Sequence, residues 1–252
     1  MKPIIQFENV HIAFGKAKVL RGLNLTISEG ETITIIGGSG SGKSVTLKLL
    51  LGVLRPDQGH IYFQGQDVTT MRERQLIEMR KKFGVLFQGS ALFDSLTVRE
   101  NIAYPLREHF DYSEEKLAHI VSEKLGLVGL SGIEKMMPAD LSGGMKKRVG
   151  LARAIATDPG VILYDEPTTG LDPTNTQRIN KLISEMQEKL KITSIVVTHD
   201  MNSAFKVSNR LALLKGGKIC FTGTIDEAQH SNDTLVRGFI EGKVAEETMG
   251  GL

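Results

Sequence analysis

The stretch Gly37-Gly38-Ser39-Gly40-Ser41-Gly42-Lys43-Ser44 decides the fold. It matches the phosphate-binding pattern G-x-x-x-x-G-K-[ST] at every fixed position. The β-branched run 32–36 before it is typical of a buried strand, and the spacing of apolar residues over 45–54 predicts a helix after it. In a strand–loop–helix of this kind, backbone N–H groups converge on phosphate oxygens. The stretch therefore predicts a nucleotide-phosphate site; the alternative is a glycine-rich turn that binds nothing.

Within this loop, Lys43 is predicted to reach the β- and γ-phosphates of ATP, and the Ser44 hydroxyl to ligate Mg²⁺. The helix that follows would add the positive end of its dipole. The residues predicted to contact the nucleotide here are Gly37, Gly38, Ser39, Gly40, Ser41, Gly42, Lys43, Ser44 and Val45.

A second acidic element follows the apolar run 161–164. A strand that delivers carboxylates at its C-terminal end puts them where open α/β sheets bind ligands. Asp165 is predicted to hold Mg²⁺ through its water shell, and Glu166 to act as general base on the attacking water. The alternative is an ordinary solvated strand end.

A second glycine-rich helix start, Leu141-Ser142-Gly143-Gly144-Met145, precedes a predicted helix over 146–156. It is understandable if Ser142 and the N–H groups of Gly143 and Gly144 contact the phosphate of a nucleotide held by another copy. Here the chain resembles the ABC ATPase family, whose usual signature is Leu-Ser-Gly-Gly-Gln. Met145 stands in place of the usual Gln. Since methionine cannot donate a hydrogen bond, any contact made by that amide is lost or supplied elsewhere. The phosphate-binding part is intact, so we expect ATPase activity to be retained.

The resemblance covers residues 4 to about 226 and implies further roles. Phe14 would stack on the adenine ring, with simple core packing as the alternative. Gln88 would contact the Mg²⁺ and water site and sense a permease. Asp172 would lie in the loop between two active sites. His199 would hydrogen-bond the γ-phosphate, with a polar strand end as the alternative.

The fold class predicted is α/β, a P-loop ABC-type ATPase. Its mostly parallel core sheet would carry an N-terminal antiparallel β subdomain and an inserted α-helical subdomain. Residues 1–242 would form a single nucleotide-binding domain, with the helical subdomain at about 94–158. The tail 243–252 has little apolar content and is predicted to be mobile. The basic residues Lys146, Lys147 and Arg148 are predicted to form an exposed first turn of the signature helix.

Composition bounds the partners. Lys plus Arg is 31 and Asp plus Glu is 29, giving a net charge of +2, so no basic excess supports a nucleic-acid partner. The single cysteine, Cys220, rules out an internal disulfide and fits a reducing compartment. No apolar run approaches the ~18 residues of a membrane span, and the start of the sequence lacks the apolar core of a signal peptide. We therefore expect a soluble chain that reaches a membrane through a partner.

The Met145 variant and the stretch 85–101 are similar to the MlaF-type ATPases, which energise phospholipid trafficking. That resemblance implies a homodimer closing on two ATP·Mg²⁺ beneath an MlaE-like permease, on the cytoplasmic face of the inner membrane. It also implies an MlaD-like MCE-domain subunit and an MlaB-like STAS-domain subunit. Alternatives are an ABC importer or exporter of another solute, or a DNA-repair type ABC ATPase. The latter usually carries a long heptad insertion, for which 94–141 is too short.

Overall fold

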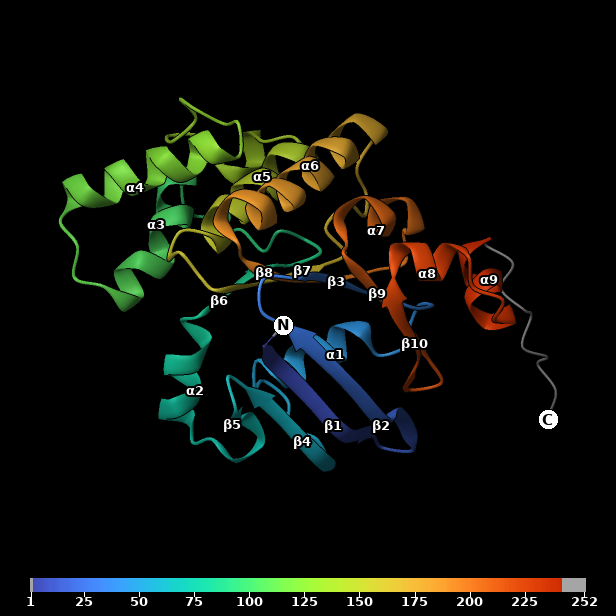
Figure 1. Cartoon of the computed structure of the whole chain (residues 1–252). Coiled ribbons are helices and arrows are strands. Elements are labelled where there is room, and N and C mark those ends of the chain that lie inside the picture. The colour runs from blue at the N-terminus through green and yellow to red at the C-terminus, as the bar shows by residue number, and fades with distance from the viewer. Residues whose placement is uncertain (1, 242–252) are drawn as a thin grey trace.

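The computed structural model describes residues 2–241 and arranges their strands in two sheets (Figure 1). The larger sheet has six strands in the order β10-β9-β3-β8-β7-β6. All neighbouring pairs are parallel except β10 with β9. Its strands are β3 (Thr32–Ile36), β6 (Phe83–Leu86), β7 (Val161–Asp165), β8 (Thr193–Thr198), β9 (Arg210–Lys215) and β10 (Lys218–Thr224). The predicted mostly parallel core sheet is confirmed.

The smaller sheet is antiparallel and has the order β2-β1-β4-β5. Along β2, Leu23, Leu25 and Ile27 are buried while Asn24 and Thr26 are exposed, the alternation of a sheet with one covered face. The predicted N-terminal antiparallel sheet is confirmed. They are β1 (Pro3–Phe14), β2 (Ala17–Ser28), β4 (Gln58–Phe63) and β5 (Gln66–Asp67).

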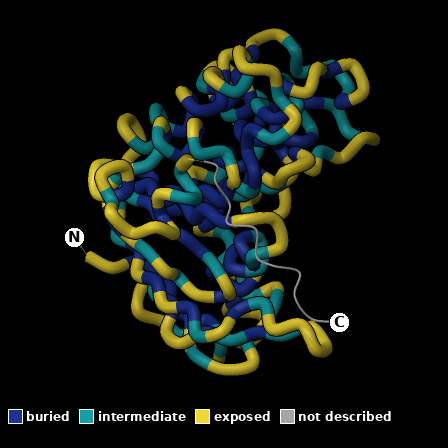
Figure 2. Tube along the Cα trace, turned by 90° about the vertical axis from the view of Figure 1, so that its right-hand side faces the viewer, coloured by how far each residue is buried: buried dark blue, intermediate teal, exposed yellow. Residues whose placement is uncertain are grey.

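The core strands read as continuous apolar runs because both faces of the parallel sheet are covered. Along β7, Val161 and Leu163 join the core shared with α1 and the small sheet. Ile162 and Tyr164, which alternate with them, join a second core formed with α3, α4, α5 and α6. Figure 2 shows the resulting buried interior beneath an exposed surface. The site residues at the ends of these strands therefore stand on a scaffold packed from both sides.

Helices cover both faces of the sheet (Figure 1). The α-helices are α1 (Lys43–Leu50), α2 (Glu73–Arg80), α3 (Val98–His109), α4 (Glu114–Leu127), α5 (Gly143–Ala154), α6 (Pro173–Leu190), α7 (Met201–Val207), α8 (Ile225–Gln229) and α9 (Thr234–Ile240). Two short 3₁₀ helices are η1 (Val68–Thr70) and η2 (Pro138–Asp140). A separate helical subdomain at 94–158 stays a prediction, because α3, α4 and α5 share one core with α6 and the sheet.

Local signals explain where the helices differ from the predicted ranges. α1 ends at Leu50, before the predicted 54, because Gly52 has a φ of +64° that interrupts the helical backbone. α5 begins at Gly143, three residues before the predicted 146, because Ser142 caps it. α7, α8 and α9 were not predicted, since helices of five to seven residues give little periodicity.

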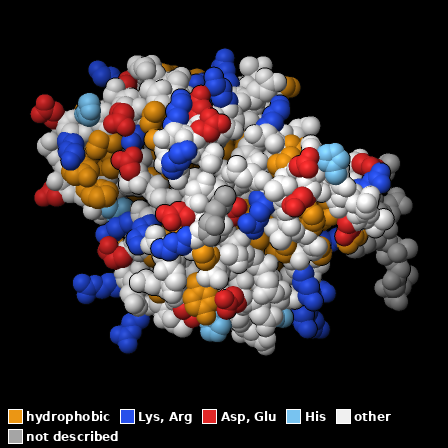
Figure 3. Space-filling view, in the orientation of Figure 1, with side chains coloured by type: hydrophobic (Ala, Val, Ile, Leu, Met, Phe, Trp, Pro, Cys, Tyr) orange, Lys and Arg blue, Asp and Glu red, His pale blue; other side chains and the backbone are white. Residues whose placement is uncertain are grey.

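On the face seen in Figure 3, basic and acidic side chains are interspersed. Within residues 2–241, no helix combines the length and apolar character that a bilayer crossing requires. The predicted tail, 243–252, lies outside the described residues.

Candidate functional site

The phosphate loop joins the end of β3 to the start of α1 and depends on glycine at particular places. Gly42 has a φ of +104°, a region that side-chain-bearing residues rarely adopt. A Cβ on Gly37 would lie 2.5 Å from the carbonyl oxygen of Leu214. The Lys43 ammonium folds back over the loop and donates to the carbonyl oxygens of Gly37 at 2.8 Å and Gly38 at 3.1 Å. The Lys43 ammonium therefore lies within the loop that the sequence predicts to bind phosphate.

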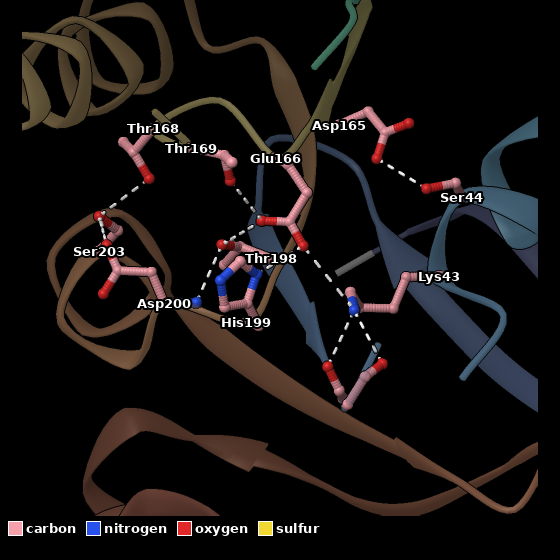
Figure 4. A network of polar contacts seen from close by, with 12 residues as sticks. Lys43, Ser44, Asp165, Glu166, Thr168, Thr169, Thr198, His199, Asp200 and Ser203 are labelled. Carbon is pink, nitrogen blue, oxygen red and sulfur yellow. Dashed lines mark hydrogen bonds and ion pairs between the residues drawn. The ribbon is translucent and has the colours of Figure 1, made fainter. Parts of the chain in front are cut away.

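Two oxygen donors suited to Mg²⁺ meet at the end of β7. The Ser44 hydroxyl donates to Asp165 Oδ1 at 2.8 Å (Figure 4). In residues 2–241, no group of three or more His, Cys, Asp or Glu side chains is arranged to hold a metal ion. A hydroxyl and one carboxylate are nevertheless the kind of sparse protein set that Mg²⁺ uses when water and phosphate complete its shell. Ser44 and Asp165 therefore fit the predicted ion.

Glu166 lies at the centre of a hydrogen-bonded cluster (Figure 4). Its Oε2 accepts from the hydroxyls of Thr198 at 3.0 Å and Thr169 at 3.1 Å. Its Oε1 lies 3.0 Å from His199 Nδ1 and 3.8 Å from Lys43 Nζ. The Glu166 backbone has a φ of +48°, uncommon for a non-glycine residue and frequent at functional sites. The carboxylate is thus held by two hydroxyl donors, His199 and the Lys43 ammonium, which come from three segments of the chain.

His199 follows β8 directly and stands at the edge of this cluster. Its side chain is more than half exposed, whereas Thr198 before it is buried. Asp200 caps α7 by accepting from Asn202 N at 3.0 Å, and its own N–H donates to the Thr198 hydroxyl at 3.0 Å. The cap and the strand together fix the backbone on both sides of the histidine.

One cavity of about 370 Å³ collects most of the predicted nucleotide contacts. Phe14, at the end of β1, is 48% exposed and lines it, so its ring is available for stacking rather than packed in the core. Gln88, which follows β6, is exposed and also lines the cavity. The lining residues are Phe14, Val19, Ser39, Gly40, Ser41, Gly42, Lys43, Ser44, Val45, Gln88, Glu166 and His199.

The predicted signature residues do not line this cavity within the described chain. Ser142 caps α5, with its Oγ accepting from Met145 N at 3.3 Å. Asp172 caps α6 by accepting from Asn175 N at 3.0 Å, and this bond together with the Asn175 amide lowers the pKa of Asp172. A Cβ on Gly144 would lie 2.4 Å from Asn175 Oδ1. Ser142, Gly143 and Asp172 are exposed, so the starts of α5 and α6 pack together and present these residues outward.

Three residues of the site were missed at the level of sequence. Thr169 and Thr198 carry no motif of their own, although each stands close in the chain to a predicted residue. Lys147 was predicted to be exposed, and this was wrong: the residue is 4% exposed and its Nζ donates to the carbonyl oxygens of Gln88 and Glu166. Burial lowers the pKa of Lys147, and the carboxylates of Asp165 and Glu166 oppose that shift.

Comparisons with known proteins agree with this geometry. Residues 20–169 match the family model described as "ABC transporter". The chain is 41% identical over 239 residues to the probable ribonucleotide transport ATP-binding protein mkl of Mycobacterium tuberculosis, covering 95% of this chain and 67% of that protein. It is 40% identical over 240 residues to the intermembrane phospholipid transport system ATP-binding protein MlaF of Haemophilus influenzae, covering 95% and 91%.

A solved structure extends the likeness to three dimensions. The ATP-binding cassette MJ0796, a dimer in a post-hydrolysis state bound to ADP and inorganic phosphate, superposes with a TM-score of 0.81 at 32% identity. The match covers 88% of this chain and 99% of that one.

Proposed function

Since this chain belongs to the ABC transporter family as an ATP-binding ATPase subunit, we propose that it works as one half of a homodimer that closes on two ATP·Mg²⁺. The observation that carries the proposal is the division of predicted residues between two places. Lys43, Glu166 and His199 line one cavity, whereas Ser142 is exposed outside it. Each nucleotide would lie between Lys43 of one copy and Ser142 of the other.

In this proposal the chain's own side chains divide the work of hydrolysis. Lys43 would turn from the loop carbonyls to the β- and γ-phosphates, and His199 would hydrogen-bond the γ-phosphate. Mg²⁺, held through Ser44, Asp165 and Gln88, would supply neutralisation of phosphate charge. Glu166 would take a proton from the attacking water while the Thr169 and Thr198 hydroxyls hold its Oε2.

An apolar groove supports a permease partner. The lining of a hollow of about 410 Å³ includes three aromatic side chains that are 42–45% exposed, Phe87, Phe93 and Tyr104. Basic residues also line it: Arg80, Lys81, His109 and Arg153. Exposed aromatic residues gathered in a groove are typical of protein interfaces. Phe87 precedes Gln88 in the chain, so a permease helix seated in this groove would press directly on the segment that enters the nucleotide cavity.

For the cargo we propose phospholipid. The Haemophilus MlaF protein is matched over 91% of its length, whereas mkl is matched over 67%. The MlaE-like permease, the MlaD-like MCE-domain subunit and the MlaB-like STAS-domain subunit belong to this proposal, as does a position on the cytoplasmic face of the inner membrane. Ribonucleotide cargo is the second candidate, because the mkl proteins are 41% identical to this chain.

Copurification from gently solubilised native membranes tests both the permease partner and the phospholipid cargo. We expect a tagged chain to bring down an integral permease, an MCE-domain subunit and bound phospholipid. Tyr104→Glu, in the groove, should lose the permease but keep ATPase activity. Phe110→Glu is the matched control, since Phe110 is 38% exposed, stacks on Tyr112 and does not line the groove. A permease that binds ribonucleotides would replace the lipid proposal, and soluble partners alone would refute the transport role.

A further inference from the structure

A buried lysine of α5, Lys147, joins the ends of two neighbouring strands. Its ammonium donates to the carbonyl oxygens of Gln88 and Glu166, the latter at 3.2 Å. Gln88 follows β6 and Glu166 follows β7, which are paired in parallel. Lys147 itself does not line the nucleotide cavity. One side chain behind the cavity therefore holds both of these residues by their backbones.

The Glu166 backbone is held from both sides. Its N–H donates to the carbonyl oxygen of Val197 at 2.9 Å. Its carbonyl oxygen accepts from Lys147 and from the N–H of Thr169 at 3.3 Å. Because its φ of +48° is unfavourable for a side-chain-bearing residue, the surroundings must maintain this conformation. The direction of the carboxylate depends on it.

The segment that follows β6 is held by the same helix. Arg153 donates to the carbonyl oxygens of Ala91 at 2.7 Å and Ser90 at 2.8 Å. Both of these residues have positive φ. Lys147 adds a third contact, to Gln88, and differs from Arg153 in also reaching Glu166. Two cationic side chains of α5, Lys147 and Arg153, thus hydrogen-bond to the turn 88–91. Lys147 also donates to the backbone of Glu166, the predicted base, at the end of β7.

An ammonium in this place needs a reason beyond packing. Burying a cation is costly unless it is hydrogen-bonded and close to negative charge. An unbranched apolar side chain such as methionine would fill a similar volume without that cost. The carbonyl contacts, together with the nearby carboxylates of Asp165 and Glu166, account for the charge.

We infer that Lys147 is a positioning residue for ATP hydrolysis, which locks Gln88 and Glu166 together so that a displacement of the 88–91 turn is passed to the carboxylate. The inference rests on the proposed function for the roles of Gln88 and Glu166. It adds the physical connection between them and assigns it to a residue that does not line the nucleotide cavity.

Steady-state ATP hydrolysis by the full chain tests this. Lys147→Met should lower kcat at least about tenfold, equal to about 1.4 kcal/mol, while KM for ATP stays within about twofold. Lys147→Arg keeps the charge and offers several donors, so it should recover kcat to within about threefold of the parent. Lys181→Met is the matched control, because Lys181 is exposed on α6 and pairs with Glu185 at the surface; it should behave as the parent. Should Lys147→Met not fold, Lys147→Leu, which also lacks a donor, should show the same split.

Two results would overturn the inference. One is a parental kcat in Lys147→Met. The other is a fall in kcat that is matched by a rise in KM and is not recovered by Lys147→Arg, which would assign a merely structural role. Glu166→Gln separates failure of the proposed function from failure of the inference about Lys147. If Glu166→Gln retains turnover, the assignment of Glu166 as the base is wrong. If it abolishes turnover while Lys147→Met does not reduce it, the proposed function stands and only the role of Lys147 fails.

Discussion

Replacing Glu166 by glutamine should stop hydrolysis and tighten ATP binding at the same time. Glutamine has the same shape, so the Thr169 and Thr198 hydroxyls can still donate to its amide oxygen. The amide cannot accept a proton from water, so kcat should fall by about 10²–10⁴, the usual contribution of a general base. The fold should be unchanged.

The expected gain in affinity follows from the contact between Glu166 and Lys43. The two charged groups lie 3.8 Å apart with side chains 11% and 8% exposed. Two unit charges at about 4 Å attract by about 4 kcal/mol at an effective dielectric constant of 20, an upper bound for a real pair. In the proposed site, phosphate oxygens would compete with this carboxylate for the Lys43 ammonium. If a third of that attraction opposes nucleotide binding, its removal lowers the Kd for ATP about tenfold.

Phosphate release at saturating ATP measures kcat, and equilibrium titration with Mg²⁺·ATP measures Kd. Glu185→Gln is the matched control: this carboxylate pairs with Lys181 at 3.8 Å and Lys189 at 3.6 Å on α6, away from the cavity. It should leave both quantities unchanged. A kcat within about tenfold of the parent in Glu166→Gln would refute the base assignment. A weaker Kd would refute the competition between Glu166 and phosphate for Lys43.

Three further substitutions probe the surroundings of the site. Ser142→Arg should block hydrolysis in phosphate-release assays and leave ATP affinity within about threefold, because Ser142 is outside the cavity; lost binding would contradict the two-copy site. Thr169→Val removes one hydroxyl from the Glu166 carboxylate, so kcat should drop about tenfold for a lost charged hydrogen bond of about 1.5 kcal/mol, and an unchanged kcat would show that the contact is dispensable. Gly144→Ala puts a methyl group 2.4 Å from Asn175 Oδ1, so thermal unfolding should show a loss of about 1–3 kcal/mol; parental stability would mean that the Asn175 side chain moves aside freely.

Much of the fold could be predicted because its core strands stand out in the sequence as continuous apolar runs. β3 was predicted with the bounds that it has, and β7 within one residue at its C-terminal end. They are buried on both faces, so their sequences are continuous β-branched or aliphatic runs ending in site residues. The short helices α7, α8 and α9 could not be predicted in this way. Their caps, Asp200, Thr224 and Asp233, fix them locally, and a single capping side chain is a weaker signal than periodicity.

The site residues, too, were predictable mainly where they stand in contiguous motifs. Most residues predicted to contact the nucleotide stand in contiguous motifs, and the structure brings Phe14, Gln88, Lys43, Glu166 and His199 to one cavity. Their functional roles remain predictions.

The supporting residues escaped prediction because their partners are remote in sequence. Lys147 is 59 residues from Gln88 and 19 from Glu166, and both contacts are to backbone oxygens. Nothing in the side-chain types of a Lys146-Lys147-Arg148 run distinguishes a buried ammonium from an exposed one. Its environment is created by tertiary packing of α5 against two strand ends.

The same packing bears on how ATP could drive motion. In the proposed dimer, the contacts of Ser142 and Gly143 with nucleotide would become available only when a second copy approaches, because both residues are exposed and do not line the chain's own cavity. The γ-phosphate would then be the group that bridges the copies, and its removal would weaken their association. Lys147 lies on the helix that Ser142 caps and is bonded to the Glu166 carbonyl. Closure at the exposed end of α5 would therefore act on the proposed base as well as on the 88–91 turn beside the groove. Both dimer closure and permease contact would then act on the Glu166 carboxylate through α5, so that hydrolysis would depend on both.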